Sequence, residues 1–425
     1  MTQLENTSTP SAALDQNSTL VCVVEMSLKG WLVAGLVPGI ERQPLKKLGT
    51  DESALHRLLL CWKAEAERAG RPIARIVLAF EAGRDGFWLA RWLRARGIEA
   101  YVIRPTSIAV SRDHRRPKTD RLDTQMLMRA FLGWLRGEPG HCRIAAIPTL
   151  EQEDAKRPTR ERETLVAERT RIINRTKSAL VRLGIRGFNP GLRDARERLA
   201  SLRTPEGVPI PPNTLAEIHR DLARLAVLQA QIAEIAAARL ERLKHATDSA
   251  HTMIRRLARV IGTGIETAEM LVTEVLSRNL RDRRAVARYA GLTGSPDESG
   301  SKRHEKGLAK TGNARVRHGM IQLAWRFLLF QKDSALARWY NARTENAKRS
   351  RKTMIVALAR KLLIALWRFV TTGQLPGASH CIPRCEPSGV LTGRKQRLQR
   401  LLFGANRWSR SEVAQPALHH GFHAA

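Results

Sequence analysis

The sequence predicts an α/β domain in its N-terminal part, followed by an α-helical coiled-coil hairpin and an all-α C-terminal domain. Short apolar runs rich in Val and Ile alternate with helical leucine spacing over residues 19–140, a pattern typical of α/β domains. Beyond residue 158 the strand pattern disappears and only helical spacing remains. The chain has 425 residues, 43% of them hydrophobic, which is enough material for two or three domain cores.

The α/β domain is predicted from its strands and helices in chain order. Buried strands are expected at Leu20–Glu25, Trp31–Leu36, Ile73–Phe80 and Glu99–Ile103. Helices are expected at Asp51–Ala69, Gly86–Arg96 and Thr119–Leu135. Lys29 and Gly30 separate the first two strands and are typical of a hairpin turn.

Two long helices are predicted in residues 158–246. Leucines and isoleucines recur there at the three- and four-residue spacing of a coiled-coil seam. A segment rich in proline, residues 203–212, separates the two helices. We therefore expect an antiparallel helical hairpin.

The C-terminal domain is expected to be helical and to begin with a helix-hairpin-helix-like segment. Gly262 and Gly264 precede a helix there and would let backbone amides approach a phosphate at its N-terminus, although an ordinary glycine-rich helix connection is the alternative. The predicted organisation is a disordered tail over 1–18, the α/β domain over 19–140, the coiled-coil linker over 141–249, the C-terminal domain over 250–375 and a mobile basic tail over 376–425.

The charge balance indicates a polyanionic partner. Lys and Arg number 73 against 40 Asp and Glu, a formal charge of +33. Such an excess opposes compaction unless a polyanion neutralises it, so nucleic acid is the expected partner. A GC-rich genome would explain Arg in place of Lys but not the shortage of acids. The five scattered cysteines, the lack of a membrane-spanning apolar run and a polar N-terminus without signal-peptide features predict a cytoplasmic, nucleoid-associated protein with no membrane partner.

Four carboxylates are candidate metal ligands. Glu25 and Glu81 end predicted strands, and Asp120 and Asp123 lie three residues apart at the start of a helix, so that both face one side. Strand ends at one sheet edge converge on a common crevice, and carboxylate oxygens suit Mg²⁺ or Mn²⁺. Two such ions about 3.5–4 Å apart stabilise the attacking and leaving oxygens of a phosphoryl transfer. Each carboxylate alone has an ordinary structural alternative; together they predict metal-dependent phosphoryl transfer.

The motifs around these carboxylates indicate a family. They run Phe80-Glu-Ala-Gly83, Gly86-Phe-Trp88, Arg104-Pro105 and Lys118-Thr-Asp-Arg-Leu-Asp123. In this order they resemble the N-terminal half of the DEDD-type insertion-sequence transposases, relatives of the Piv-type DNA invertases. The resemblance implies an RNase-H-like fold similar to the RuvC resolvase, with Glu25, Glu81, Asp120 and Asp123 at the family's Asp, Glu, Asp and Asp positions.

Glu25 departs from the family pattern. One extra methylene moves its carboxylate by roughly 1.5 Å. Because Mg²⁺ demands near-ideal octahedral geometry, the change could lower activity, shift the metal preference towards Mn²⁺ or be absorbed by a small strand shift.

The C-terminal motifs resemble the second domain of the same transposases. They are Tyr289-Ala-Gly-Leu292, the loop Ser295-Pro-Asp-Glu-Ser-Gly300 and Lys310-Thr-Gly-Asn313. In that family the serine of Ser-Gly is the proposed nucleophile, which corresponds to Ser299 here. A flexible-loop serine is the alternative, with Ser295 and Ser301 close by.

Basic residues in two places are candidates for nucleic-acid binding. On the first helix of the hairpin they are Arg162, Arg169, Arg171, Arg175, Lys177, Arg182 and Arg186, for which a solvated charged face is the alternative. Around Ser299 they are Lys302, Arg303, Lys310, Arg315 and Arg317.

Together these features predict a transposase or site-specific recombinase that cleaves and exchanges DNA strands. The resemblance implies a structured non-coding RNA, encoded by the element itself, that pairs with donor and target DNA while the protein grips the backbone. It also implies a homo-oligomer, dimer or tetramer, because recombination acts on more than one strand. The alternatives are a nucleic-acid-binding relic weakened at Glu25 and a junction-resolving endonuclease without serine chemistry.

Overall fold

The computed structural model describes residues 13–108, 119–138, 140–300, 302–309, 311–345 and 351–373, without the side chains of Lys302, Arg303, Glu305 and Lys306. The chain divides into two compact units. The α/β unit comprises Thr2–Glu153 with Leu276–Ala285, and the helical unit comprises Asp154–Val275 with the chain from Val286 onward. The predicted domain boundaries stay predictions, and most of the two predicted tails lies outside the described residues.

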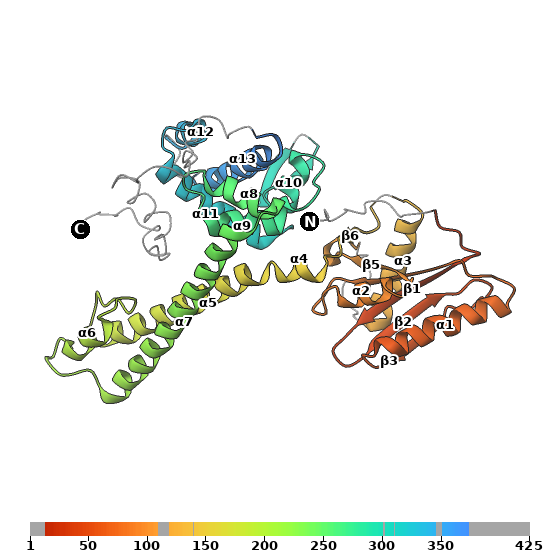
Figure 1. Ribbon diagram of the computed structural model, residues 1–425, viewed down its shortest axis with the longest axis horizontal. Coiled ribbons are helices and arrows are strands. Elements are labelled where there is room, and N and C mark those ends of the chain that lie inside the picture. Colours follow the sequence, from red (N-terminus) through yellow and green to blue (C-terminus); the bar gives the residue numbers. More distant parts are fainter. Residues whose placement is uncertain are drawn as a thin grey trace. The chain divides into compact units, whose positions relative to one another are not determined.

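The α/β unit is built on a six-stranded mixed sheet (Figure 1). Its strands lie in the order β3-β2-β1-β4-β5-β6. Parallel pairing joins β1 to β4 and β4 to β5, whereas β2, β3 and β6 pair antiparallel to their neighbours. The bounds are β1 Thr19–Met26, β2 Trp31–Leu36, β3 Leu45–Leu48, β4 Arg75–Glu81, β5 Glu99–Ile103 and β6 Ile144–Ala145.

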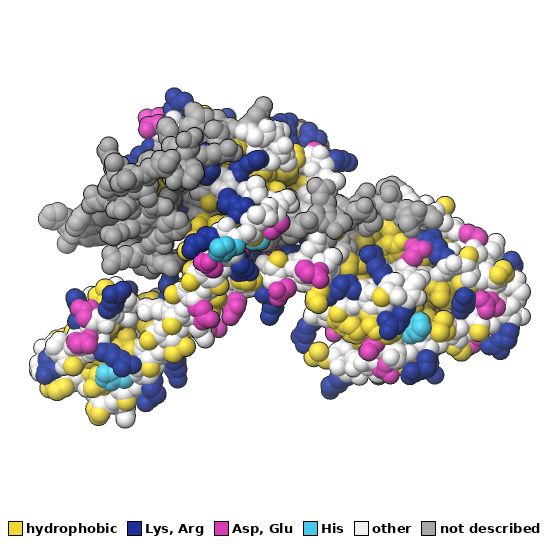
Figure 2. Space-filling model, viewed as in Figure 1, with side chains coloured by type: hydrophobic (Ala, Val, Ile, Leu, Met, Phe, Trp, Pro, Cys, Tyr) yellow, Lys and Arg dark blue, Asp and Glu magenta, His cyan; other side chains and the backbone are white. Residues whose placement is uncertain are grey.

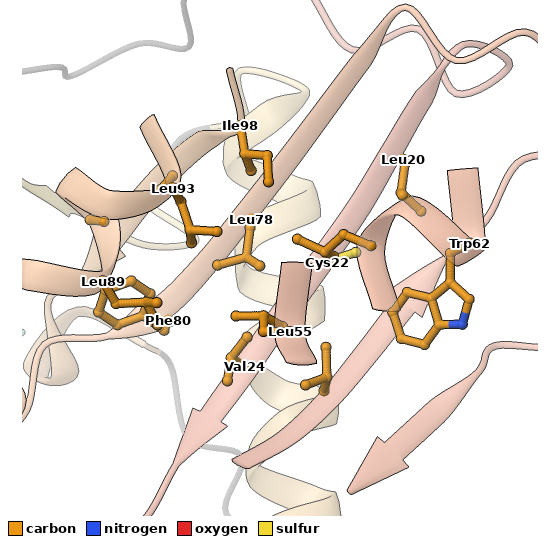
Figure 3. Close-up of a cluster of buried hydrophobic side chains, with 14 of the residues drawn as sticks. Leu20, Cys22, Val24, Leu55, Trp62, Leu78, Phe80, Leu89, Leu93 and Ile98 are labelled. Atoms are coloured by element: carbon orange, nitrogen blue, oxygen red, sulfur yellow. The ribbon is translucent and has the colours of Figure 1, made fainter. Parts of the chain in front are cut away.

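Helices cover both faces of this sheet because its central strands are apolar on both sides. On one face, Cys22 and Val24 of β1 pack with Leu55 of α1 (Glu52–Arg68) and Leu89 of α2 (Trp88–Arg94) (Figure 3). Asp51 caps α1 by accepting from the Ser53 and Ala54 amides. The side chains at the alternate positions of these strands form a second core on the other face.

The second core lies between the sheet and α3 (Asp120–Leu135). Val21 and Val23 of β1 and Val77 of β4 pack there with Leu127 and Phe131 of α3. Strand side chains alternate between faces, so the odd-numbered residues of β1 and β4 all point towards α3. This alternation decides on which face the candidate carboxylates of the strand ends lie.

The helical unit begins with two long helices, α5 (Arg157–Arg182) and α7 (Pro212–His245). They pack against each other along an apolar seam that includes Ile172 and Leu180 of α5 and Leu225 of α7. The coiled-coil hairpin and the helix-hairpin-helix-like segment stay predictions. The remaining elements are α4 Leu150–Asp154 at the junction of the units, α6 Ala195–Ser201, α8 Ser249–Ala258, α9 Ile265–Leu271, α10 Arg283–Tyr289, α11 Ala314–Phe330, α12 Ala335–Thr344 and α13 Arg351–Thr372.

The prediction of an all-α C-terminal domain was wrong in one respect. An antiparallel hairpin of β7 (Gly294–Ser299) and β8 (Lys302–Leu308) stands where a loop was expected around Ser299. Its sequence lacks the apolar alternation of a half-buried strand and contains Pro296, which disfavours strands. The hairpin is held by backbone pairing of exposed residues, a property that hydrophobic patterning does not report.

The distribution of charge and apolarity over the surface is mixed. On the face seen in Figure 2, Lys and Arg side chains are spread over the described parts with Asp and Glu between them. Among the described helices, none is long and apolar enough to cross a membrane.

Candidate active site

The first candidate site lies where β1 and β4 end. Glu25 and Glu81 each follow by one residue the paired Val24 and Phe80 of these parallel strands. Both glutamates line one pocket of about 540 Å³. By strand alternation both also lie on the α3 face of the sheet. The structure therefore brings together the two carboxylates that sequence reasoning assigned to strand ends.

The two aspartates of α3 lie on the sheet-facing side of that helix. Thr124 and Leu127 are buried against the sheet, and Asp120 and Asp123 precede them by one helical turn each. Thr119 caps the helix by accepting from the Leu122 amide at 3.3 Å. Asp120 and Asp123 thus start the stripe of α3 that faces the strands, although the lining of the Glu25–Glu81 pocket does not include them.

The four carboxylates suit a divalent cation in chemistry but are not gathered around one point. Their oxygens are the hard donors that Mg²⁺ and Mn²⁺ prefer. Within the described parts of the chain, no three His, Cys, Asp or Glu side chains lie close enough to hold a metal ion. The donor set therefore fits the cation in chemical kind, whereas the described side chains do not converge on one metal position.

Sequence reasoning missed other charged residues of this pocket. Asp85 lies in the turn that follows β4 and lines the pocket, as do Lys29 and Arg84. The available signal was position, because all three residues come within a few places of the strand ends that were singled out.

The second candidate site is the β7–β8 hairpin. Ser299 is the last residue of β7, is exposed and pairs in register with Lys302 across the turn. Gly300 follows with a φ of 57°, the left-handed conformation that glycine adopts easily. Ser295 lies half-buried at the other end of β7, and Ser301 and Lys310 lie outside the described residues.

Two glycines clasp the base of this hairpin. A Cβ atom added at Gly291 would lie 2.2 Å from the Thr311 carbonyl oxygen, and one at Gly312 would lie 2.6 Å from the Arg288 carbonyl oxygen. Both glycines have positive φ, 66° and 88°. The Ala309 amide also donates to the Thr293 carbonyl at 3.1 Å. Residues 289–292 and 311–313, which lie on either side of the hairpin in sequence, are therefore the two halves of one clasp at the base of the hairpin that bears Ser299.

Two ranges of the chain match sequence models of known protein families. A sequence model described as "Transposase IS116/IS110/IS902 family" matches residues 254–340, and a transposase model of the DEDD IS110 type matches residues 43–185. A protein of Sinorhizobium fredii (strain NBRC 101917 / NGR234), named as a transposase, y4rJ, is 39% identical over 381 residues, 87% of this chain and 96% of that protein. The chain belongs to the IS110-type DEDD transposase family. It is a DNA transposase, and DNA is its partner.

The matched ranges cover most of the candidate residues of this transposase. Glu81, Asp120 and Asp123 lie within the matched range 43–185 and Ser299 within the matched range 254–340, whereas Glu25 precedes both. The mixed sheet followed by a helical region fits an RNase-H-like domain joined to a helical domain. The predicted family and enzyme class are thus confirmed.

Some of the predicted nucleic-acid-binding arginines are engaged within the transposase itself. Arg162 pairs with Glu266 of α9 at 2.7 Å, and Arg175 donates two hydrogen bonds to Asp221 of α7 at 2.9 and 2.6 Å. Burial lowers the pKa of the Arg162 guanidinium, while the bond to Asp221 raises that of Arg175.

The other basic residues of α5 differ in exposure. Arg171 is 72% exposed, and Arg182 is exposed at the end of the helix. Lys177 and Arg186 line a second pocket, of about 430 Å³, whereas the Nε atom of Arg169 is buried without a hydrogen-bond partner. The surface available to a polyanion is therefore the part of α5 nearer its C-terminal end.

Four further residues that were predicted to bind nucleic acid also make contacts within the fold. Arg315 pairs with Glu163 of α5, and Arg317 donates to the Thr311 carbonyl oxygen at 3.3 Å. Gly262, with a φ of 93°, packs near Phe330, and Gly264 is the N-cap residue of α9. These contacts give each of the four residues a role inside the fold.

Proposed function

We propose that this transposase breaks and rejoins DNA by transesterification, with Ser299 as the nucleophile and Glu25, Glu81, Asp120 and Asp123 as ligands of Mg²⁺ or Mn²⁺. The observation that carries the proposal is the position of Ser299, exposed at the tip of a hairpin whose base is rigidly clasped. A nucleophile must reach a phosphodiester while its backbone stays fixed, because misplacement by about 1 Å can cost about a hundredfold in rate. The exposed position of Ser299 and the close backbone contacts at the hairpin base support this role.

The chemistry conserves the phosphate ester. The Ser299 hydroxyl oxygen bonds to phosphorus, the bond from phosphorus to the leaving DNA oxygen breaks, and the serine proton passes through a base to that oxygen. The reverse step, with the hydroxyl of another strand as nucleophile, reseals the DNA without ATP. Attack by water would instead leave a phosphate monoester that cannot be rejoined without an energy source, so the covalent serine ester is what keeps the cleaved end ready for resealing.

Serine is a weak nucleophile at neutral pH and needs activation. A divalent cation held by the acidic residues would supply charge neutralisation at the phosphate and favour the ionised nucleophile. Glu25 and Glu81 would bind it from the strand ends, and Asp120 and Asp123 from the first turn of α3. Lys302, Arg303 and Lys310 flank Ser299 in sequence and would neutralise the scissile phosphate, whereas Arg315 and Arg317 would act mainly by holding the hairpin base.

We also propose that structured RNA encoded by the element pairs with donor and target DNA, and that the protein works as a dimer or tetramer. Support comes from the formal charge of +33 and from the exposed cations towards the end of α5. A surface that recognises backbone phosphates without reading bases is suited to a reaction in which pairing selects the sequence.

The decisive experiment is Ser299→Ala with supercoiled substrate and Mn²⁺, followed by denaturing electrophoresis. The wild type should leave protein covalently attached to DNA, and the variant should bind DNA with unchanged affinity but form no adduct. Ser295→Ala, the matched control on the same strand, should form the adduct normally. An adduct that persists in Ser299→Ala would remove the serine from its proposed role.

A second function has one observation in its favour. Glu stands at position 25 where the family pattern has Asp, which supports a transposase weakened to a nucleic-acid-binding relic. Metal-dependent nicking of branched DNA without any adduct would instead favour a junction-resolving endonuclease.

A further inference from the structure

Glu274 is a buried carboxylate that none of the proposed chemistry uses. It lies in a π-helical turn, Val272–Leu276, that continues α9, and it is only 3% exposed. π-Helical turns cost stability and occur often at functional sites. A buried carboxylate also requires partners that compensate for its lost hydration. The position of Glu274 therefore depends on the partners that its carboxylate binds.

The two oxygens of Glu274 bind different parts of the helical unit. Its Oε1 accepts from Nε and Nη2 of Arg160 on α5, at 3.1 and 2.9 Å. Its Oε2 accepts from Nδ2 of Asn313 at 3.0 Å. One carboxylate therefore connects the first turn of α5 to the motif that ends the hairpin clasp.

Asn313 has all of its polar atoms committed. Its Oδ1 caps α11 by accepting from the Arg315 and Val316 amides at 3.1 and 3.3 Å. The backbone amide of Asn313 donates to the Tyr289 carbonyl oxygen, across the clasp, at 2.7 Å. Because Oδ1 is occupied by the cap, only Nδ2 is left to face Glu274, and the polarity of this contact is fixed.

We propose that Glu274 is a positioning residue for Ser299. By fixing Asn313 between α11, the clasp and α5, it sets where the hairpin leaves the helical unit and hence where the serine stands. This inference rests on the proposed role of Ser299, but the connection itself concerns the hairpin alone and has its own readout.

The fixed polarity allows a reversal test. In Glu274→Gln, Oε1 still accepts from Arg160, but the new amide group faces the Asn313 amide, donor against donor. In Asn313→Asp, the side chain still caps α11, because Asp is as good an N-cap as Asn, but it faces Glu274 oxygen to oxygen. The double variant places a Gln donor against an Asp acceptor and restores the contact with opposite polarity.

The rate of adduct formation at saturating DNA should follow this polarity. Each single variant should be slowed roughly tenfold or more, with unchanged affinity for DNA, and the double variant should return to within about threefold of wild type. Glu234→Gln, the same substitution at an exposed site on α7, is the matched control and should behave as wild type. Thermal melting should show every variant folded at the assay temperature.

Hydrogen exchange supplies the second readout. The amides of residues 293–309 should exchange faster in both single variants and recover in the double, while those of α13 stay unchanged. Should a single variant fail to fold, Arg160→Met tests the same carboxylate from its half-exposed partner and should give a smaller loss of the same kind. Singles that match wild type in both readouts, or a double no better than the worse single, would overturn the inference. If the inference is overturned in this way but the adduct still requires Ser299, the proposed function stands. If Ser299→Ala still forms the adduct, the proposed function fails, and hydrogen exchange alone then tests the role of Glu274.

Discussion

The two units of this transposase use carboxylates in opposite ways. In the helical unit, Asp221 and Glu274 are almost completely buried, and each accepts hydrogen bonds from an arginine of α5. In the α/β unit, Glu25 and Glu81 lie partly exposed in a pocket, and Asp120 lies exposed at a helix start. The first arrangement holds helices together, and the second leaves oxygens where a ligand can reach them.

The contrast shows how to distinguish carboxylates that stabilise the fold from carboxylates that are candidate metal ligands in a highly basic protein. A charged pair that is buried contributes to the fold, and removing one partner leaves the other poorly solvated. A carboxylate that stays partly exposed where a strand ends is expected to contribute less to stability than a buried ion pair, and a cation can reach it. Substitutions in the two sets should therefore separate activity from stability.

The largest effect is expected from Asp120→Asn or Asp123→Asn. Each should lower metal-dependent DNA cleavage by roughly a hundredfold or more, because a lost oxygen ligand removes charge stabilisation that only the reaction uses. Melting temperature should stay within a few degrees of wild type. The control is Glu67→Gln, an exposed site on α1. Full cleavage by either variant, or by wild type in excess EDTA, would contradict the assignment.

Asp221→Asn should instead lower the free energy of unfolding, whereas the substitutions at Asp120 and Asp123 lower the cleavage rate. Arg175 and Arg224 both donate to the Asp221 carboxylate, and removing its charge should cost about 1–3 kcal/mol. Both arginines are about half exposed, so the lower end of that range is expected. Denaturant titration measures the change, and Asp194→Asn, which breaks an exposed pair with Arg198, should leave the midpoint unchanged.

The same aspartate predicts a pH dependence. Burial raises the pKa of Asp221, but the bonds from Arg175 and Arg224 more than offset it, so the pKa lies below its usual value. Its contribution is then complete above the unfolded pKa of about 3.9 and is lost as pH falls through the lower folded pKa. The stability difference between wild type and Asp221→Asn should be constant from about pH 7 to 5 and shrink below about pH 4. A difference that grew on acidification would refute this sign.

Glu25→Asp tests the metal preference of the candidate metal site. Asp restores the family's residue and shortens the side chain by one methylene, so we expect Mg²⁺-supported cleavage to rise about tenfold relative to Mn²⁺-supported cleavage. Parallel rate measurements in the two metals test this. An unchanged ratio would mean that the strand end already accommodates the longer side chain.

The smallest effects are expected for the basic residues of α5. Arg171→Ala and Arg182→Ala should each reduce the salt dependence of RNA or DNA binding by about 0.7–0.9 in the log–log slope, without lowering the melting temperature. Arg175→Ala should lower the melting temperature instead, because its guanidinium holds Asp221. Binding titrations over a series of KCl concentrations distinguish the two outcomes. A slope changed by Arg175→Ala and not by the others would reverse the division proposed here.

Much of the α/β unit could be predicted from sequence because its strands are buried on both faces. Runs such as Leu20–Glu25 need only local hydrophobicity to be recognised, and β5 has the predicted bounds. The edge strand β3 was missed because its Leu-Lys-Lys-Leu sequence is half polar and is held by pairing with β2. Edge strands depend on a neighbour that a local pattern does not reveal.

The sites divide along the same line. Strand ends and helix starts are local features, and Glu25, Glu81, Asp120 and Asp123 could be proposed as candidates from them. The engagement of Arg162 and Arg175, by contrast, depends on carboxylates far away in the sequence. Glu274 was missed for the same reason, since only the folded chain brings it to Arg160 and Asn313.

The glycine clasp has a consequence for which positions of the hairpin segment can be changed. Neither Gly291 nor Gly312 leaves room for a side chain, so the two ends of the hairpin segment approach each other closely through their backbones. A side chain at either glycine would displace these backbone contacts, whereas changes at the exposed residues of β7 leave them in place. The hairpin is thus anchored at its base through backbone contacts, and its exposed side chains take no part in that anchor.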